Sequence, residues 1–163
     1  MKSNAVLDQP CDFTLMRPEK TPVTRDSNKS GAEKHSADVI CLVDDDPSVR
    51  KSVGRLLQSA GLRARTFSEP EAFLEHLALN PVPVAVLDIW MEHMTGMELL
   101  AHLCARSPQT RVIFITGYED HAAEDTVMSA GAFAFFIKPF DDEQFLTEVR
   151  RALAAPTHDQ PGG

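Results

Sequence analysis

The sequence predicts an α/β fold in which five parallel strands form one doubly wound sheet with helices on both faces. Two observations support this prediction. From residue 38 to about residue 155, short apolar runs alternate five times with segments whose apolar residues recur at helical spacing. Most of these runs contain few polar residues, as strands do when both faces of a parallel sheet are covered.

Two strand–helix repeats make up the first half of this pattern. The run from Val39 to Val43 is followed by a helical segment that ends at Gly61, a residue type that readily adopts the left-handed conformation beyond a helix end. Residues 63–67 are the next expected strand. Ser68 to Glu71 has the spacing of a capping box, with proline at an early position that helices tolerate, so a helix is expected to begin there.

Three further repeats follow. Thr95 to Glu98 forms a second capping box, which predicts the start of the third helix. A weaker helix is expected from about residue 120 to residue 130, closed by Gly131, and the last helix places Leu146, Val149 and Leu153 on one face. The remaining three strands are the apolar runs at 83–87, 111–115 and 133–137.

Four of the apolar runs end in polar residues. A carboxylate beside a core costs several kcal/mol unless it is compensated, so its repetition at strand ends indicates a function. The carboxyl ends of parallel strands meet at one edge of the sheet, where ligands bind. We therefore expect one site that contains Asp44 and Asp45 after the first run, Asp88 after the third, Thr116 after the fourth and Lys138 after the fifth.

These residue types favour phosphoryl chemistry. Converging carboxylates raise one another's pKa unless a cation is present, and Mg²⁺ prefers oxygen ligands of this kind. A carboxylate nucleophile, Mg²⁺, a lysine and a hydroxyl are what the formation of an aspartyl phosphate requires. Taken alone, an acidic triplet is usually a solvated turn, and Asp46 before Pro47 is expected to be a helix N-cap. No His or Cys spacing supports zinc.

Composition limits the setting. The net charge of −8 argues against direct nucleic-acid binding, and no apolar stretch approaches the length of a membrane span. No secretory signal is recognised, and the three cysteines lack paired spacing, so a cytoplasmic protein is expected. Residues 1–37 are polar and hold scattered prolines, which predicts a disordered N-terminal arm. The domain is expected at 38–155, followed by a polar tail at 156–163.

The ordered set of motifs resembles the receiver domain of bacterial two-component response regulators, a flavodoxin-like fold, in its FixJ-like class. Asp88 and Thr116 are 28 residues apart, and Thr116 and Lys138 are 22 apart, as in that class. The resemblance covers about residues 38–155. The matching segments are Leu42 to Asp46, Leu87–Asp88 with Met94 to Gly96, Ile115 to Gly117, Gly131–Ala132 and Lys138 to Phe140.

The resemblance implies a role for each site residue. Asp88 would accept a phosphoryl group from a histidine kinase or a phosphotransfer protein. Asp45, Asp88 and the main-chain carbonyl of Trp90 would hold Mg²⁺, with Asp44 acting through a metal-bound water. Thr116 and Lys138 would bind the phosphoryl oxygens. Phe135 would be the aromatic switch residue, although an ordinary core aromatic is an equal alternative, and the Lys138–Pro139 bond is expected to be cis.

Several residues depart from the family pattern. Glu92 stands where the family usually has proline, and Ala134 stands where an acid is common. Two positions that tune phosphate lifetime hold Trp90 and Tyr118, both bulky. We expect these two side chains to screen the acyl phosphate from water and to slow its hydrolysis.

Too few residues follow the last helix for a DNA-binding module, so a stand-alone receiver is expected, with no enzymatic activity on an external substrate. It would signal through a downstream protein, and phosphorylation-dependent homodimerisation is consistent with the resemblance. The expected contact face contains Val127, Met128 and Phe133. Three alternatives stay open: the receiver portion of a longer DNA-binding regulator, a receiver-like binding module that ignores phosphate, and an aspartate-nucleophile phosphatase. The phosphatase would need an acid where Trp90 stands.

Overall fold

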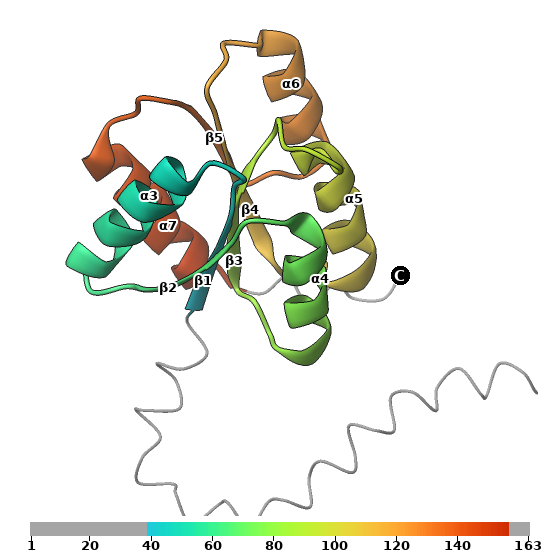
Figure 1. The fold of residues 1–163 in the computed structure, drawn as a ribbon, viewed down its shortest axis with the longest axis horizontal. Helices are drawn as coiled ribbons and strands as arrows, with labels where there is room; N and C mark the ends of the chain where they lie inside the picture. The colour runs from blue at the N-terminus through green and yellow to red at the C-terminus, as the bar shows by residue number, and fades with distance from the viewer. Residues whose placement is uncertain (1–38, 157–163) are drawn as a thin grey trace, which may run out of the picture. The chain divides into compact units, whose positions relative to one another are not determined.

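A computed structural model describes residues 39–156. Five strands and five helices alternate within this range, as the sequence predicts (Figure 1). The elements are β1 (Val39–Val43), α3 (Pro47–Ser59), β2 (Arg63–Phe67), α4 (Pro70–Leu79), β3 (Val84–Asp88), α5 (Gly96–Arg106), β4 (Arg111–Thr116), α6 (His121–Ser129), β5 (Ala134–Ile137) and α7 (Asp142–Ala154).

The strands form one parallel sheet in the order β2-β1-β3-β4-β5. The chain moves outward from β1 to β2 and then crosses back to β3, so the strand order reverses between β1 and β3. In open α/β sheets this reversal leaves a crevice at the carboxyl ends of the two strands. The predicted doubly wound, five-stranded sheet is therefore confirmed.

Alternating strand residues feed two separate cores. Cys41 and Val43 of β1 pack in the core that α4, α5 and α6 cover, whereas Ile40 and Leu42 pack in the core that α3 and α7 cover. Figure 1 shows these two groups of helices on opposite faces of the sheet. The β3 strand is buried along its whole length, because it lies at the centre of the sheet and both its faces are covered.

Helix ends follow most of the predicted signals. Asp46 caps α3 by accepting a hydrogen bond from the Ser48 amide, and Thr95 forms the predicted capping box with Glu98. Gly61 and Gly131 adopt positive φ angles of 80° and 108° beyond α3 and α6, as expected of helix stops.

Two of the sequence-based expectations are wrong, and a third concerns residues that the structure does not describe. The capping box at Ser68 is wrong: α4 begins at Pro70, so Glu69 is the N-cap residue and makes no side-chain cap bond. Val127 is not exposed, because it lies on the inner face of α6 and is fully buried, whereas Met128 is exposed and Phe133 is half-buried. The arm at 1–37 and the tail from 157 onward lie outside the described residues. In the range 39–156 no helix is long and apolar enough to cross a membrane.

Candidate functional site

The parallel register brings four polar strand ends to one edge of the sheet. Asp44 directly follows β1, Asp88 is the last residue of β3, Thr116 is the last residue of β4, and Lys138 directly follows β5. Asp88 pairs in register with Ile115, and Thr116 pairs with Ile137, so these ends stand at nearly the same level. The predicted site residues therefore meet at the reversal point of the strand order.

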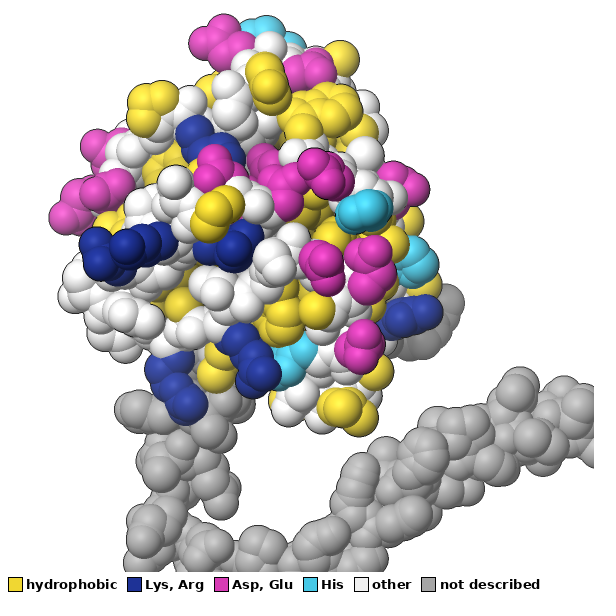
Figure 2. All heavy atoms as spheres, in the orientation of Figure 1, with side chains coloured by type: hydrophobic (Ala, Val, Ile, Leu, Met, Phe, Trp, Pro, Cys, Tyr) yellow, Lys and Arg dark blue, Asp and Glu magenta, His cyan; other side chains and the backbone are white. Residues whose placement is uncertain are grey.

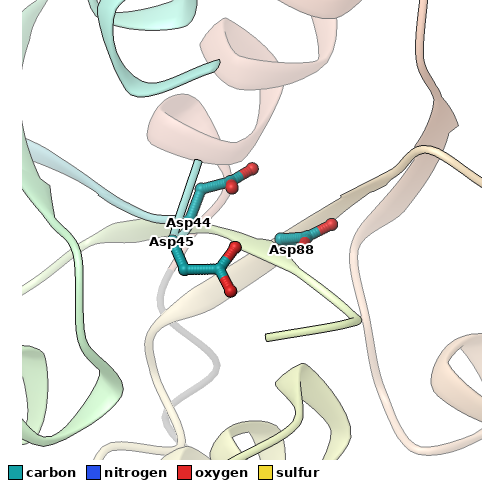
Figure 3. A group of neighbouring side chains, drawn as sticks. All are labelled: Asp44, Asp45 and Asp88. Carbon is teal, nitrogen blue, oxygen red and sulfur yellow. The ribbon is translucent and has the colours of Figure 1, made fainter. Parts of the chain in front are cut away.

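Three carboxylates form the centre of the site. One oxygen from each of Asp44, Asp45 and Asp88 lies within 4.8 Å of the other two. Figure 3 shows Asp44 and Asp45 at the end of β1, facing the end of β3 where Asp88 lies. Asp44 and Asp88 are buried and Asp45 is exposed, so the cluster is open to solvent on the side of Asp45.

Lys138 compensates part of this negative charge. Its Nζ donates a hydrogen bond to Oδ2 of Asp44 at 3.3 Å and lies 3.6 Å from Oδ1 of Asp88. The main chain fixes the base of the lysine, because the Lys138 amide donates to the Thr116 carbonyl at 2.7 Å. The following Lys138–Pro139 peptide bond is cis, as expected.

Burial and mutual repulsion disfavour the charged forms of the two inner carboxylates. Burial, followed by the charge of Asp44, raises the pKa of Asp88 from its usual 3.8 to about 7, even though Lys138 opposes the shift. Burial also raises the pKa of Asp44. One lysine therefore does not neutralise the cluster. An oxygen-only cluster with excess negative charge fits a hard divalent cation such as Mg²⁺.

Neighbouring main-chain groups hold the acidic residues in place. Oδ1 of Asp44 accepts from the Asp46 amide at 2.9 Å, and the Asp44 carbonyl accepts from Nη1 of Arg50 at 2.7 Å. Oδ2 of Asp45 accepts from the Glu92 amide at 3.2 Å, which ties the β3–α5 loop to the end of β1. Neither contact could be predicted from sequence, because nothing around Arg50 or Glu92 signals it.

The remaining predicted residues surround this centre or lie near it. Thr116 is fully buried, and its Oγ1 accepts from the Tyr118 amide at 3.3 Å. Phe135 is half-buried and packs against the core beneath α4, α5 and α6. The side chains of Trp90 and Tyr118 are 44% and 66% exposed. The role of Phe135 in switching and the roles of Trp90 and Tyr118 in phosphate lifetime stay predictions.

Gly96 allows α5 to approach the acidic strand end. A Cβ atom at this position would lie 2.3 Å from the main-chain oxygen of Asp88 and 2.9 Å from Cε1 of Phe114. The Gly96 amide donates to the Ile89 carbonyl at 2.8 Å, so the first turn of α5 is fastened directly beside Asp88. Only glycine fits this close approach, because any side chain would displace the end of β3 or the start of α5.

A family model for the response regulator receiver domain matches residues 40–150. Response regulator protein TmoT of Ectopseudomonas mendocina is 36% identical over 115 residues, which are 71% of this chain and 52% of TmoT. Transcriptional regulatory protein FixJ of Azorhizobium caulinodans is 37% identical over 112 residues, which are 69% of this chain and 53% of FixJ. The chain thus spans about half the length of these curated relatives.

Solved structures agree with this match. The beryllofluoride-activated NtrC4 receiver domain dimer resembles the fold with a TM-score of 0.68 and 28% identity, covering 71% of this chain and 96% of that one. Together, the family model, the curated relatives and this structure confirm the resemblance on which the sequence analysis relied.

Replacing Gly96 by alanine is expected to destabilise the fold by about 1–3 kcal/mol, because the new methyl group would overlap the Asp88 carbonyl. Urea denaturation measures the effect. Gly117→Ala is the matched control, since a Cβ there has no atom within 4 Å and should change the free energy of unfolding by less than about 0.5 kcal/mol. Equal stability of the two variants would show that α5 does not need this approach.

The raised pKa of Asp88 predicts how stability depends on pH without metal. Because that pKa is about 7 in the folded chain and near 3.8 in the unfolded chain, the folded state holds the extra proton between these values. Stability should therefore fall as pH rises from about 4 to about 7. Asp88→Asn should remove this loss and be more stable than the unmutated protein at pH 8, by roughly 2–4 kcal/mol.

Urea denaturation in EDTA at pH 5 and pH 8 tests this dependence. The difference between the two proteins should shrink as the pH falls and vanish only below about pH 3, where Asp88 is protonated in both the folded and the unfolded chain. A difference that stays constant with pH would contradict the pKa shift.

Proposed function

The chain belongs to the response regulator receiver family, and we propose that Asp88 is the residue that accepts its phosphoryl group. The observation that carries this proposal is the position of Asp88: a buried carboxylate at the end of the central strand, 3.6 Å from a lysine, with an oxygen within 4.8 Å of one from each of two further acids. The proposed phosphodonor is a phosphohistidine on a sensor histidine kinase or on a histidine phosphotransfer protein.

The proposed transfer uses groups that already converge at the strand ends. A carboxylate oxygen of Asp88 attacks phosphorus, the bond between phosphorus and the imidazole nitrogen breaks, and its electron pair stays on the ring. The product is an aspartyl phosphate on Asp88. Lys138 would pair with a phosphoryl oxygen, and the Thr116 hydroxyl would donate to another. Self-phosphorylation and dephosphorylation would be the only chemistry of the chain, without an external substrate.

Mg²⁺ is the proposed cofactor. The carboxylates of Asp45 and Asp88 and the main-chain carbonyl of Trp90 would hold it, with Asp44 acting through a metal-bound water. Three oxygen donors within 4.8 Å of one another and only one nearby lysine support this assignment. When bound, Mg²⁺ supplies positive charge that offsets the negative charge of the phosphoryl oxygens. The same acids would repel a phosphodonor if no cation were present.

Phe135 is proposed to transmit phosphorylation of Asp88 to the surface around the edge strand β5. It lines a cleft of about 420 Å³ between β5 and α7, together with Phe136, Gln144, Thr147 and others. Movement of Thr116 towards the phosphate would let the aromatic ring turn inward, which would change this cleft. We propose that a downstream protein, or a second phosphorylated copy, reads the change. Light scattering with and without beryllofluoride measures whether a homodimer forms.

A second candidate is that this receiver works as one part of a longer transcription regulator. The half-length coverage of TmoT and FixJ favours it, as does the name of FixJ, a transcriptional regulatory protein. Immunoblotting of the source cells distinguishes the two candidates: a band near 18.0 kDa supports a stand-alone receiver, and a much larger band supports the longer regulator. We propose a cytoplasmic location in either case.

Incubation with acetyl phosphate and Mg²⁺ should add one phosphate to the unmutated protein and none to Asp88→Asn, as measured by intact mass. Omitting Mg²⁺ should abolish the gain, because the acidic cluster would then repel the donor. Asp46→Asn is the matched control: asparagine caps helices as well as aspartate does, and Asp46 lies outside the cluster, so this variant should still gain the phosphate.

Loss of the gain in both variants would place the acceptor or the fold in doubt. A phosphate on Asp88→Asn would exclude Asp88 as the acceptor. No gain in the unmutated protein, together with no Mg²⁺ binding, would favour a receiver-like module that ignores phosphate.

Trp90 and Tyr118 are predicted to slow hydrolysis of the aspartyl phosphate. Both side chains are exposed, and both follow a site residue by two positions, so they are free to lie over the phosphate. Replacing both by alanine should shorten the half-life of the phosphorylated protein about tenfold, roughly 1.4 kcal/mol in barrier height. Leu79→Ala, which removes an exposed apolar side chain from the end of α4, is the control and should leave the half-life unchanged. An unchanged half-life in the double variant would reject the screening role.

A further inference from the structure

Positive charge is concentrated in one continuous segment of the domain. Residues 47–68, which contain α3 and β2, hold five basic and no acidic residues. The other residues in the range 39–156 hold five basic and 17 acidic residues. Figure 2 shows Lys and Arg side chains over α3 and β2, whereas Asp and Glu side chains lie over the strand ends, on the right of the domain and at its left edge. Asp142 lines a pocket with Val49 and Ser52 of α3. We call the face formed by α3 and β2 the basic face.

Four of the five basic side chains are exposed. Lys51 and Arg55 stand one helical turn apart on the outer side of α3. Arg63 and Arg65 extend from the edge strand β2 on the sheet face opposite α3, where Arg65 lies over the Phe67 ring. The fifth, Arg50, is half-buried and donates to the Asp44 carbonyl. Within residues 39–156, Lys51 and Arg55 form no ion pair with an acidic side chain. Their charge is therefore available to a partner.

The main chain of β2 adds hydrogen-bonding groups to this face. β2 is an edge strand, and the Phe67 carbonyl accepts from the Asp44 amide next to β1. Since main-chain groups alternate sides along a strand, those of Ala64 and Thr66 point away from β1.

We propose that the basic face is a docking surface for an acidic protein segment. The segment would lie along α3 and the edge of β2. Helix α3 has 13 residues and is therefore about 20 Å long, which is the length of three to four turns of a helical partner. Arg63 is at the amino end of β2, so the surface runs from the middle of α3 away from Asp88. A docked segment would therefore leave the phosphoacceptor open, and this contact goes beyond the proposed function.

The surroundings of the basic face favour a protein over other polyanions. Acidic residues border it on both sides along the chain, Asp44 to Asp46 before α3 and Glu69, Glu71 and Glu75 after β2. A nucleic-acid duplex or a flat anionic membrane would also meet these carboxylates, whereas a narrow acidic segment would not. No large hydrophobic residue is exposed between residues 47 and 68, so the face lacks the apolar anchor of a membrane-binding helix.

Isotope-edited NMR of the full chain tests the proposal with defined probes. The first probe is a 15-residue helical peptide rich in Glu, and the others are a 15-base-pair DNA duplex and vesicles that contain phosphatidylserine. We expect the acidic peptide to shift amide signals of residues 51–66 and to bind at least tenfold more weakly in 300 mM than in 50 mM salt. Lys51→Glu combined with Arg55→Glu should weaken binding by a further factor of ten or more.

Arg106→Glu combined with Arg150→Glu is the matched control, because both arginines are exposed but lie on α5 and α7. This control should bind the peptide as the unmutated protein does. Both double variants should still gain one phosphate from acetyl phosphate, so a failure of docking is distinguishable from a failure of the phosphoacceptor. Tighter binding to the duplex or to the vesicles, or equal effects of the two double variants, would overturn the proposal.

Discussion

The burial of two carboxylates beside a single lysine is the constraint on which the site depends. Asp44 and Asp88 are buried at the carboxyl ends of β1 and β3. Among the described residues, Lys138 is the only cation that forms an ion pair with each of them. An ion pair near 4 Å is worth about 4 kcal/mol at an effective dielectric constant of 20, which offsets one negative charge and leaves the others uncompensated. A proton on Asp88 or a divalent cation relieves the remainder. Full ionisation of the three carboxylates is therefore electrostatically unfavourable, and added positive charge would lower its cost.

The sheet keeps these charges together against their repulsion. β3 is buried on both faces and paired on both sides, so Asp88 cannot move away without breaking main-chain hydrogen bonds to β4 and contacts in both cores. Gly96 adds a second restraint, because α5 begins in direct contact with the Asp88 carbonyl. The Asp46 and Arg50 hydrogen bonds do the same for Asp44. A rigid scaffold thus holds an arrangement that free side chains would avoid.

Much of this could be predicted from sequence, for reasons that particular residues illustrate. Asp88 and Thr116 could be placed together because parallel strands bring their carboxyl ends to one edge, whatever the details of packing. The capping box at Thr95 is a local signal that needs no tertiary information. The cap of α4 was misassigned because the position of Pro70, rather than the hydroxyl of Ser68, decides where that helix begins. The close approach of Gly96 and the buried side of Val127 depend on how helices sit against the sheet, which local spacing does not specify.

The acidic site and the basic face should respond differently to added salt. The carboxylates of Asp44 and Asp88 and the side chain of Lys138 are largely buried, so salt screens their interaction only weakly, whereas Lys51 and Arg55 are exposed to solvent. At an ionic strength of 0.1 M the Debye length is about 10 Å, and further salt shortens it, so an attraction at the basic face weakens while the site changes little. Because α3 begins at the acidic cluster and carries Lys51 and Arg55 away from it, one helix joins both regions. We therefore expect salt to separate the two proposals experimentally: phosphorylation from acetyl phosphate should persist at a salt concentration at which docking of an acidic segment is lost.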